Sequence, residues 1–183
     1  MIQKTSFPFE PQKATEVAAR FIALSGGTIN IMKLVKLVYL LDRESIARRG
    51  VPVVGGVYLS MRNGPVTSEI LDLINSGQLW KCDTNWEEFI SDRQNHEVAL
   101  HRDPGAEHLS GFELELIGEL SAQFQADQWA VAKWCHENCG EWLPLEAGAE
   151  PISLALLATE VGREPTAVMQ NAKEANFLSR VFG

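Results

Sequence analysis

Apolar residues recur at helical spacing along most of the chain. The clearest run lies within residues 28–49, where they occupy positions i, i+3, i+4 and i+7 of one helix face and further leucines widen that face. The residues concerned are Ile31, Leu34, Val35, Leu37, Val38, Leu40 and Leu41. So wide an apolar face predicts a central helix that is buried on more than one side.

Several shorter segments show the same periodicity together with helix start signals. Ser110 and Glu113 fit a capping box, Asp127 and Ser153 can each cap a helix, and Pro165 suits a first helical turn. Besides the central helix, the pattern predicts helices over residues 14–24, 66–75, 154–161 and 165–181, with two more following Ser110 and Asp127.

Little of the chain favours strands. Two short apolar segments flank a polar stretch within residues 86–101, which predicts a β-hairpin. Asn63-Gly64-Pro65 predicts a turn, with the proline opening the helix over residues 66–75. We therefore expect a mainly α, single-domain helical bundle with a small β-hairpin, spanning residues 1–183 with a core at about 14–175.

The charge is unevenly distributed. The chain of 183 residues has 16 Lys and Arg against 24 Asp and Glu, a net charge of −8, which disfavours broad nucleic-acid binding. Residues 29–64 nevertheless sum to +4, whereas residues 103–150 sum to −9. This asymmetry indicates either two solvated faces or two opposed partner surfaces, and the acidic block is the first candidate for a protein contact.

Motifs for catalysis, cofactors and membranes are missing from the sequence. Cys135, His136 and Cys139 resemble part of a zinc site, but Cys82 is the only other thiol, and adjacent helical residues point apart. We expect buried cysteines, no metal, no cofactor and no enzymatic activity. Three cysteines without a disulfide framework, no apolar run of membrane-spanning length and no secretory signal favour the cytoplasm.

Residues 152–181 can be interpreted as a helix–turn–helix. Gln170 and Asn171 could contact bases, but Lys173 is accompanied by Glu164 and Glu174, which weakens binding to phosphates. A transcriptional repressor that binds DNA through this segment is the alternative hypothesis.

Four motifs occur in an order that resembles the Panacea domain of SocA-like antitoxins. The first is KLVKLVY at residues 33–39, and the second is Asn63-Gly64-Pro65-Val66 followed by Glu69. His136 with Trp142 and the segment at residues 151–153 complete the similarity, which covers about residues 14–175. The candidate toxin-contact or family-signature residues are Lys33, Lys36, Tyr39, Asn63, Gly64, Pro65, Glu69, His136 and Trp142.

The resemblance implies an antitoxin of a bacterial or phage toxin–antitoxin system. Such a protein binds and neutralises a cognate toxin directly, or delivers it to a protease as an adaptor. From the residues themselves, we expect Tyr39 to pack its ring while its hydroxyl finds a polar partner. We also expect the imidazole of His136 to bond a free carbonyl at a helix end.

Overall fold

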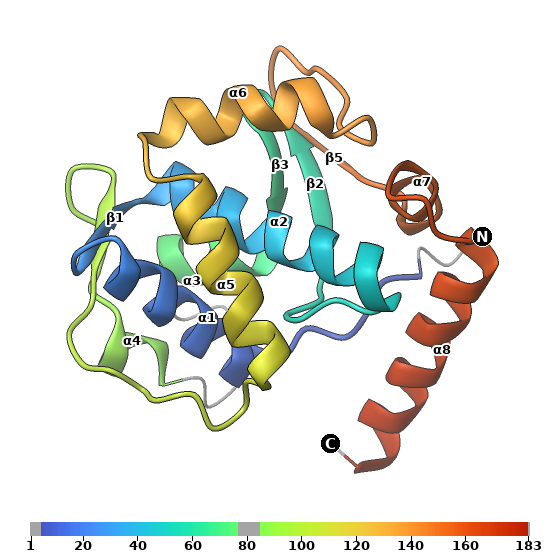
Figure 1. The fold of residues 1–183 in the computed structure, drawn as a ribbon, viewed down its shortest axis with the longest axis horizontal. Helices are drawn as coiled ribbons and strands as arrows, with labels where there is room; N and C mark the ends of the chain where they lie inside the picture. The colour runs from blue at the N-terminus through green and yellow to red at the C-terminus, as the bar shows by residue number, and fades with distance from the viewer. Residues whose placement is uncertain (1–4, 77–84, 183) are drawn as a thin grey trace.

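The structure is a computed structural model that describes residues 5–76 and 85–182 (Figure 1). Cys82 and the predicted helix stop at Gly77 lie outside these residues. In chain order the elements are α1 (Pro11–Leu24), β1 (Thr28–Asn30), α2 (Ile31–Arg49), β2 (Tyr58–Met61), β3 (Gly64–Thr67), α3 (Ser68–Ser76), α4 (Trp86–Phe89), β4 (Glu97–Ala99), α5 (Gly111–Gln123), α6 (Gln128–Asn138), β5 (Ala149–Pro151), α7 (Leu154–Glu160) and α8 (Pro165–Phe182).

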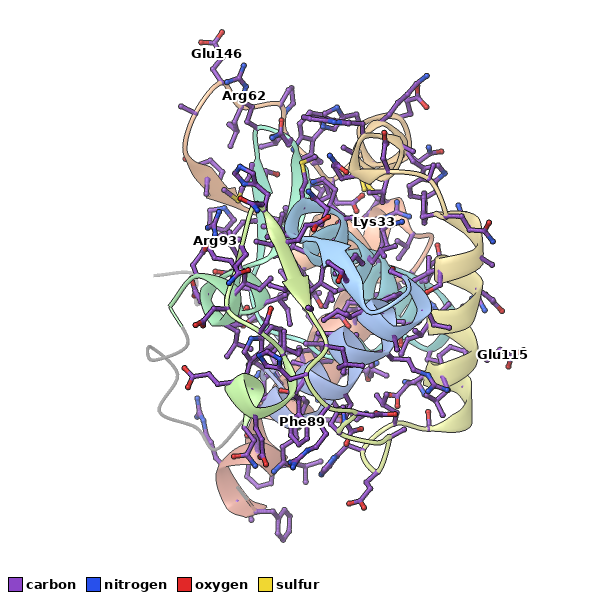
Figure 2. All side chains as sticks on the ribbon, turned by 90° about the vertical axis from the view of Figure 1, so that its left-hand side faces the viewer. Lys33, Arg62, Phe89, Arg93, Glu115 and Glu146 are labelled. Carbon is purple, nitrogen blue, oxygen red and sulfur yellow. The ribbon has the colours of Figure 1, made fainter. Side chains whose placement is uncertain are left out.

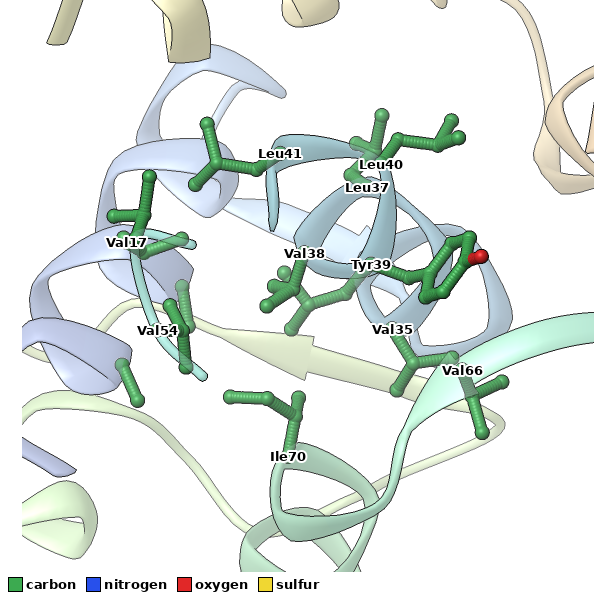
Figure 3. Close-up of a cluster of buried hydrophobic side chains, with 14 of the residues drawn as sticks. Val17, Val35, Leu37, Val38, Tyr39, Leu40, Leu41, Val54, Val66 and Ile70 are labelled. Atoms are coloured by element: carbon green, nitrogen blue, oxygen red, sulfur yellow. The ribbon is translucent and has the colours of Figure 1, made fainter. Parts of the chain in front are cut away.

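Helix α2 is the centre of the molecule, as the apolar pattern predicts. Figure 1 shows it between α1, α5 and α6, all of which pack against it. Thirteen of its nineteen residues are buried, and Figure 3 shows its apolar side chains packed against Val17, Val54, Val66 and Ile70. Among the buried residues of α2 are also charged ones, Lys36, Asp42 and Arg43, which an apolar core must accommodate.

The predicted helix caps are present. Ser110 and Glu113 form the reciprocal capping box of α5, and the Asp127 side chain accepts hydrogen bonds from Trp129 and Ala130 at the start of α6. The Ser153 hydroxyl caps α7. These local signals fixed the helix boundaries because each satisfies backbone N–H groups that the first helical turn leaves unpaired.

The strands differ from the prediction in two places. Gly64 and Pro65 belong to β3, which pairs with β2 through a two-residue turn at residues 62–63, and β5 adds a third antiparallel strand. The helix that was expected to start at Val66 therefore starts at Ser68. The prediction of proline at a first helical turn was wrong because proline also fits an edge strand such as β3, where Pro65 is paired with Ser60 and needs no ladder hydrogen bond on its outer side.

The predicted hairpin at residues 86–101 is only partly correct. Residues 86–89 form helix α4 instead of a strand, and only an isolated bridge joins Ile90 to Leu100. Strand β4 pairs with β1, which lies where the sequence predicted the first residues of the central helix. The pattern of a single segment could not reveal this partner, because β1 is more than sixty residues away in the chain.

Helices α7 and α8 follow the predicted ranges. They pack on each other, and α8 runs along the side of the molecule away from β1 (Figure 1). The exposed apolar side chains near its end are Phe177, Leu178, Val181 and Phe182. The helix–turn–helix hypothesis thus stays a prediction, but the exposed end of α8 is apolar rather than basic.

A helix that spans a membrane needs about 20 consecutive, mainly apolar residues. None of the helices within residues 5–76 and 85–182 is long and apolar enough to cross a bilayer.

Candidate functional site

A pocket of about 670 Å³ opens at the N-terminal end of α2. Its walls are the first turns of α2, the tip of the β2–β3 hairpin, the turn before β4 and the first turn of α6. Side chains from four distant parts of the sequence therefore meet at one place. The polar and aromatic residues that line this Lys36 pocket are Asn30, Lys36, Arg62, Asn63, Arg93, Asn95, His96, Gln128 and Trp129.

The Lys36 pocket is basic in a protein that is acidic overall. Lys36, Arg62 and Arg93 line it, and no Asp or Glu is among its lining residues in the described part of the chain. Figure 2 labels Arg62 and Arg93, which come from the hairpin tip and from the segment before β4. The N-terminal turn of α2 adds the positive end of a nineteen-residue helix dipole. The local field of the pocket therefore favours an anion.

Lys36 is buried without a counter-ion. It is 1% exposed, and among residues 5–76 and 85–182 it has neither a hydrogen bond nor an ion-pair partner. Burial lowers its pKa from 10.5 to about 8, while the thiols of Cys135 and Cys139 oppose this shift. Burial removes most of the water around this ammonium without supplying an acceptor, which is costly to the fold and points to a role in binding rather than stability.

Gly64 allows the β2–β3 hairpin to approach the Lys36 ammonium. A Cβ on Gly64 would lie 2.7 Å from Nζ of Lys36 and 3.6 Å from Cδ2 of His136. Its φ of +116° is also a conformation that L-residues with a side chain rarely adopt. Only glycine therefore fits here without displacing the lysine.

His136 and Trp142 hold the hairpin tip in place. Their rings stack in parallel with centroids 4.2 Å apart, and the indole Nε1 of Trp142 donates to the carbonyl of Met61 at 2.8 Å. The expectation that His136 bonds a free carbonyl was wrong: within the described chain its ring makes this stacking contact and no such hydrogen bond. The stack fixes α6 relative to the hairpin, and so fixes one wall of the Lys36 pocket.

Another wall is a tight turn. Asn95 and His96 both have positive φ, 51° and 64°, and Gln94 and Glu97 exchange two backbone hydrogen bonds around them. This is the geometry of a two-residue hairpin turn with the twist that antiparallel strands prefer. The carbonyl of His96 accepts from the N–H of Ile31 at 2.8 Å, which ties the turn to the start of α2.

Behind the pocket, a buried ion pair anchors α2 to the segment after α6. Nε of Arg43 donates to Oε1 of Glu141 at 2.7 Å, and the Tyr39 hydroxyl donates to the same oxygen. Glu141 is 1% exposed. The prediction that Tyr39 packs its ring and bonds a polar partner is confirmed, and burial beside Glu141 raises the pKa of its hydroxyl.

Two buried carboxylates hold the loop before β2. Asp42 accepts from the N–H groups of Val53, Val54 and Gly55, at 2.7 to 2.9 Å, and from the Tyr58 hydroxyl. Burial raises the pKa of Asp42 to about 6, against the effect of these donors. Glu69 holds the same loop by accepting from Val57 N at 2.9 Å. These carboxylates bind backbone N–H groups of the loop, and neither is among the residues that line the Lys36 pocket.

Comparison with known families places these elements in context. The sequence model of the family described as "Antitoxin SocA-like, Panacea domain" matches residues 34–143, well over half of the chain. The chain belongs to this family. No curated protein and no solved structure matches it. The matched Panacea region includes Lys36, the β2–β3 hairpin, the turn before β4 and the start of α6, and thus most of the pocket wall.

The nine signature candidates fall into two groups in the structure. Lys36, Asn63 and Gly64 line the pocket, with His136 and Trp142 directly behind the hairpin tip. The other four belong to the scaffold. They are Lys33, whose ammonium donates to the carbonyl of Ala126 at 2.7 Å, Tyr39 beside Glu141, Pro65 within β3, and Glu69 in α3, which accepts from Val57 in the loop before β2.

Sequence reasoning missed the other half of the pocket. Arg62, Arg93 and His96 were not candidates, and neither was Trp129, which is 59% exposed at the pocket rim. One sequence signal could have found the turn, because Asn and His are the non-glycine residues that tolerate positive φ most readily. No local sequence signal predicts that Arg62 and Arg93 line the same pocket, since only the tertiary fold brings them together.

Half of the basic residues of 29–64 pair with carboxylates of 103–150. Arg43 contacts Glu141, Arg48 contacts Glu119 at 2.6 Å, and Arg49 contacts Glu113 at 3.4 Å. The Arg43–Glu141 pair is buried, so these two charges do not contribute to a surface. The acidic block as the partner contact remains a prediction, and two of the other three basic residues of 29–64, Lys36 and Arg62, line the Lys36 pocket.

The two cysteines in the described part of the chain lie in the interior. Cys135 and Cys139 are both buried, as predicted, and Cys135 together with burial raises the pKa of the Cys139 thiol. Within the described residues, no group of three or more His, Cys, Asp or Glu side chains is arranged to hold a metal ion.

The pKa of Lys36 leads to a pH-dependent stability. In the folded state the pKa is about 8, and in the unfolded chain it returns to about 10.5, so between these values the unfolded state binds more protons. The free energy of unfolding therefore increases with pH across this window. By urea denaturation we expect a gain of about 2 kcal/mol between pH 8 and about 9.5. Lys36→Met should lack this gain, and an equal gain in that variant would contradict the assignment.

Proposed function

We propose that this Panacea domain is an antitoxin that neutralises a protein toxin by binding it directly at the Lys36 pocket. Membership of the antitoxin family supports a role in a toxin–antitoxin system. We choose this pocket as the toxin-binding surface because Lys36, a buried cation without a partner among the described residues, lies at its floor. The proposal requires no catalytic activity from this chain, and places it in the cytoplasm with its toxin.

The rim of the pocket has the composition of a protein-binding surface. Trp129 is 59% exposed beside the pocket, and Arg62 is exposed at the hairpin tip. Trp and Arg are the side chains that most often contribute the largest share of binding energy in interfaces. Transfer of the exposed apolar surface of Trp129 from water to the interface with a partner would also be favourable, by about 25 cal/mol per Å².

Co-expression tests the proposal. The candidate toxin is the product of the neighbouring reading frame, expressed with and without this protein in the same host. We expect the neighbour to stop growth alone, growth to recover with the antitoxin, and the two proteins to purify as one complex. A neighbour that is harmless alone, or that remains toxic without forming a complex, would contradict the proposal.

The same experiment separates direct neutralisation from delivery to a protease. Direct neutralisation leaves the toxin level unchanged when growth recovers. Delivery to a protease would instead lower the toxin level, and protease-deficient hosts would then lose the rescue.

A further inference from the structure

We propose that the Lys36 pocket receives an acidic side chain of the toxin, an Asp or Glu on a projecting segment, whose carboxylate pairs with the Lys36 ammonium. This inference rests on the proposed function and specifies the chemistry of recognition. It follows from three features of the pocket: its charge, the missing partner of Lys36, and the apolar residues around that lysine.

The charge of the pocket calls for an anion. Three cationic side chains and no carboxylate line it, although the chain carries eight more acidic than basic residues. Lys36 has three N–H donors, and none of them has an acceptor among the described residues. His136 on α6 lies near Gly64. The side chains whose charge affects the pKa of Lys36 most are the thiols of Cys135 and Cys139, and no carboxylate of the described residues forms an ion pair with Lys36.

The apolar part of the pocket favours a carboxylate on a peptide over free phosphate. Val35, Val66 and Leu71 line the pocket beside Lys36, and Trp129 covers its rim. A phosphate carries a larger charge and is held best by donors on several sides, whereas apolar side chains flank Lys36 here and one N–H of Arg93 is already bonded to Asn75 at 2.6 Å. An acidic side chain with an apolar neighbour matches both kinds of lining.

Binding would use a lysine that folding has already desolvated in part. When a carboxylate arrives, it displaces the water around Lys36 in the pocket, and the ion pair forms partly shielded from solvent, where its Coulomb energy is larger than in bulk water. The neutral amide of Gln or Asn would leave the ammonium uncompensated. The pocket therefore discriminates strongly between an acid and its amide on the toxin.

Small-molecule probes test the pocket without the toxin. The probes are the N-acetyl methylamides of glutamate and glutamine, with N-acetyl-leucine and inorganic phosphate as alternative anions. Binding is measured at constant ionic strength as the shift of the Gly64 amide resonance. We expect saturable, millimolar binding of the glutamate probe alone, lost in Lys36→Met and retained in Lys173→Met. Lys173 is an exposed lysine on α8 and is not a pocket residue.

The other outcomes overturn the inference in distinguishable ways. Equal shifts with the glutamate and glutamine probes would show that charge is not recognised. Saturation by phosphate or N-acetyl-leucine, but not by the glutamate probe, would make this a phosphate site or a chain-terminus site.

Binding of the toxin itself is the second test of the inference. By calorimetry we expect Lys36→Met to weaken toxin binding about 100-fold or more, and Lys173→Met to leave it within about 3-fold. Equal binding by both variants would overturn the carboxylate inference and leave direct neutralisation intact. A toxin that fails to bind even the unmodified protein would overturn the proposed function, whatever the probes show.

Discussion

Replacing Lys36 with methionine is expected to stabilise the protein by about 3 kcal/mol at pH 7. Methionine keeps the length of the side chain but removes an ammonium that burial has deprived of most of its water without supplying an acceptor. The difference between the usual pKa of 10.5 and about 8 corresponds to this free energy, and methionine also packs well among the apolar residues of the pocket. Urea denaturation of both proteins measures it.

Two comparisons make this result specific. Lys173→Met removes a positive charge from an exposed position on α8, and should change the free energy of unfolding by less than about 0.5 kcal/mol. The advantage of Lys36→Met should also shrink as the pH rises above about 8, because the native lysine then loses its proton. A destabilised Lys36→Met variant at pH 7 would mean that the ammonium has a favourable partner in the fold.

Replacing Glu141 with glutamine is expected to destabilise the protein by about 3 to 5 kcal/mol. The side chain of Arg43 is only 10% exposed, and its Nε lies 2.7 Å from Oε1 of Glu141. Glutamine has the same shape but cannot neutralise the guanidinium, so the variant leaves a buried cation unpaired. The Tyr39 hydroxyl also loses its charged acceptor. Urea denaturation measures the loss.

Glu119 provides a matched control for this effect. Glu119→Gln breaks an Arg–Glu pair at a similar distance, between Arg48 and Glu119, in which both side chains are more than 40% exposed. That loss should stay below about 1 kcal/mol. Replacing both Arg43 and Glu141 by Met and Leu should recover most of the stability, because neither member of the pair then leaves an unpaired buried charge. Equal losses in Glu141→Gln and Glu119→Gln would contradict the account of the anchor.

The sequence was most informative where a signal is local. The apolar pattern of α2, the capping box of Ser110 and Glu113, and the cap at Asp127 all place helices correctly, because each depends on residues within one or two turns. Pro65 misled for the same reason. Its fixed φ suits a helix start and a strand alike, and only pairing with β2 decides between them.

The sequence predicted some residues of the candidate site but not their arrangement. The family motifs include Lys36, Gly64 and His136, and the structure brings these three together. They do not show that Lys36 is buried and unpartnered, because its neighbours come from the hairpin and from α6. Arg93 and Trp129 joined the site only in three dimensions, through the pairing of β4 with β1 and the position of α6.

The structure alters the interpretation of the two charge blocks, residues 29–64 and 103–150. A block of −9 and a block of +4 suggested two separate faces, yet Arg43, Arg48 and Arg49 are neutralised by carboxylates of the acidic block. Summed charge along a sequence does not distinguish internal pairs from surface charge. Three of the ten carboxylates in residues 103–150 are paired in this way, and the protein combines a small basic pocket with an overall excess of acidic side chains.

Growth rescue by matched variants is the most direct test of the account. The toxin is co-expressed with the unmodified protein, with Lys173→Met, or with Lys36→Met, at equal protein levels. The account predicts rescue by the first two and none by Lys36→Met, although that variant is the most stable of the three. Full rescue by Lys36→Met would contradict neutralisation through the Lys36 pocket.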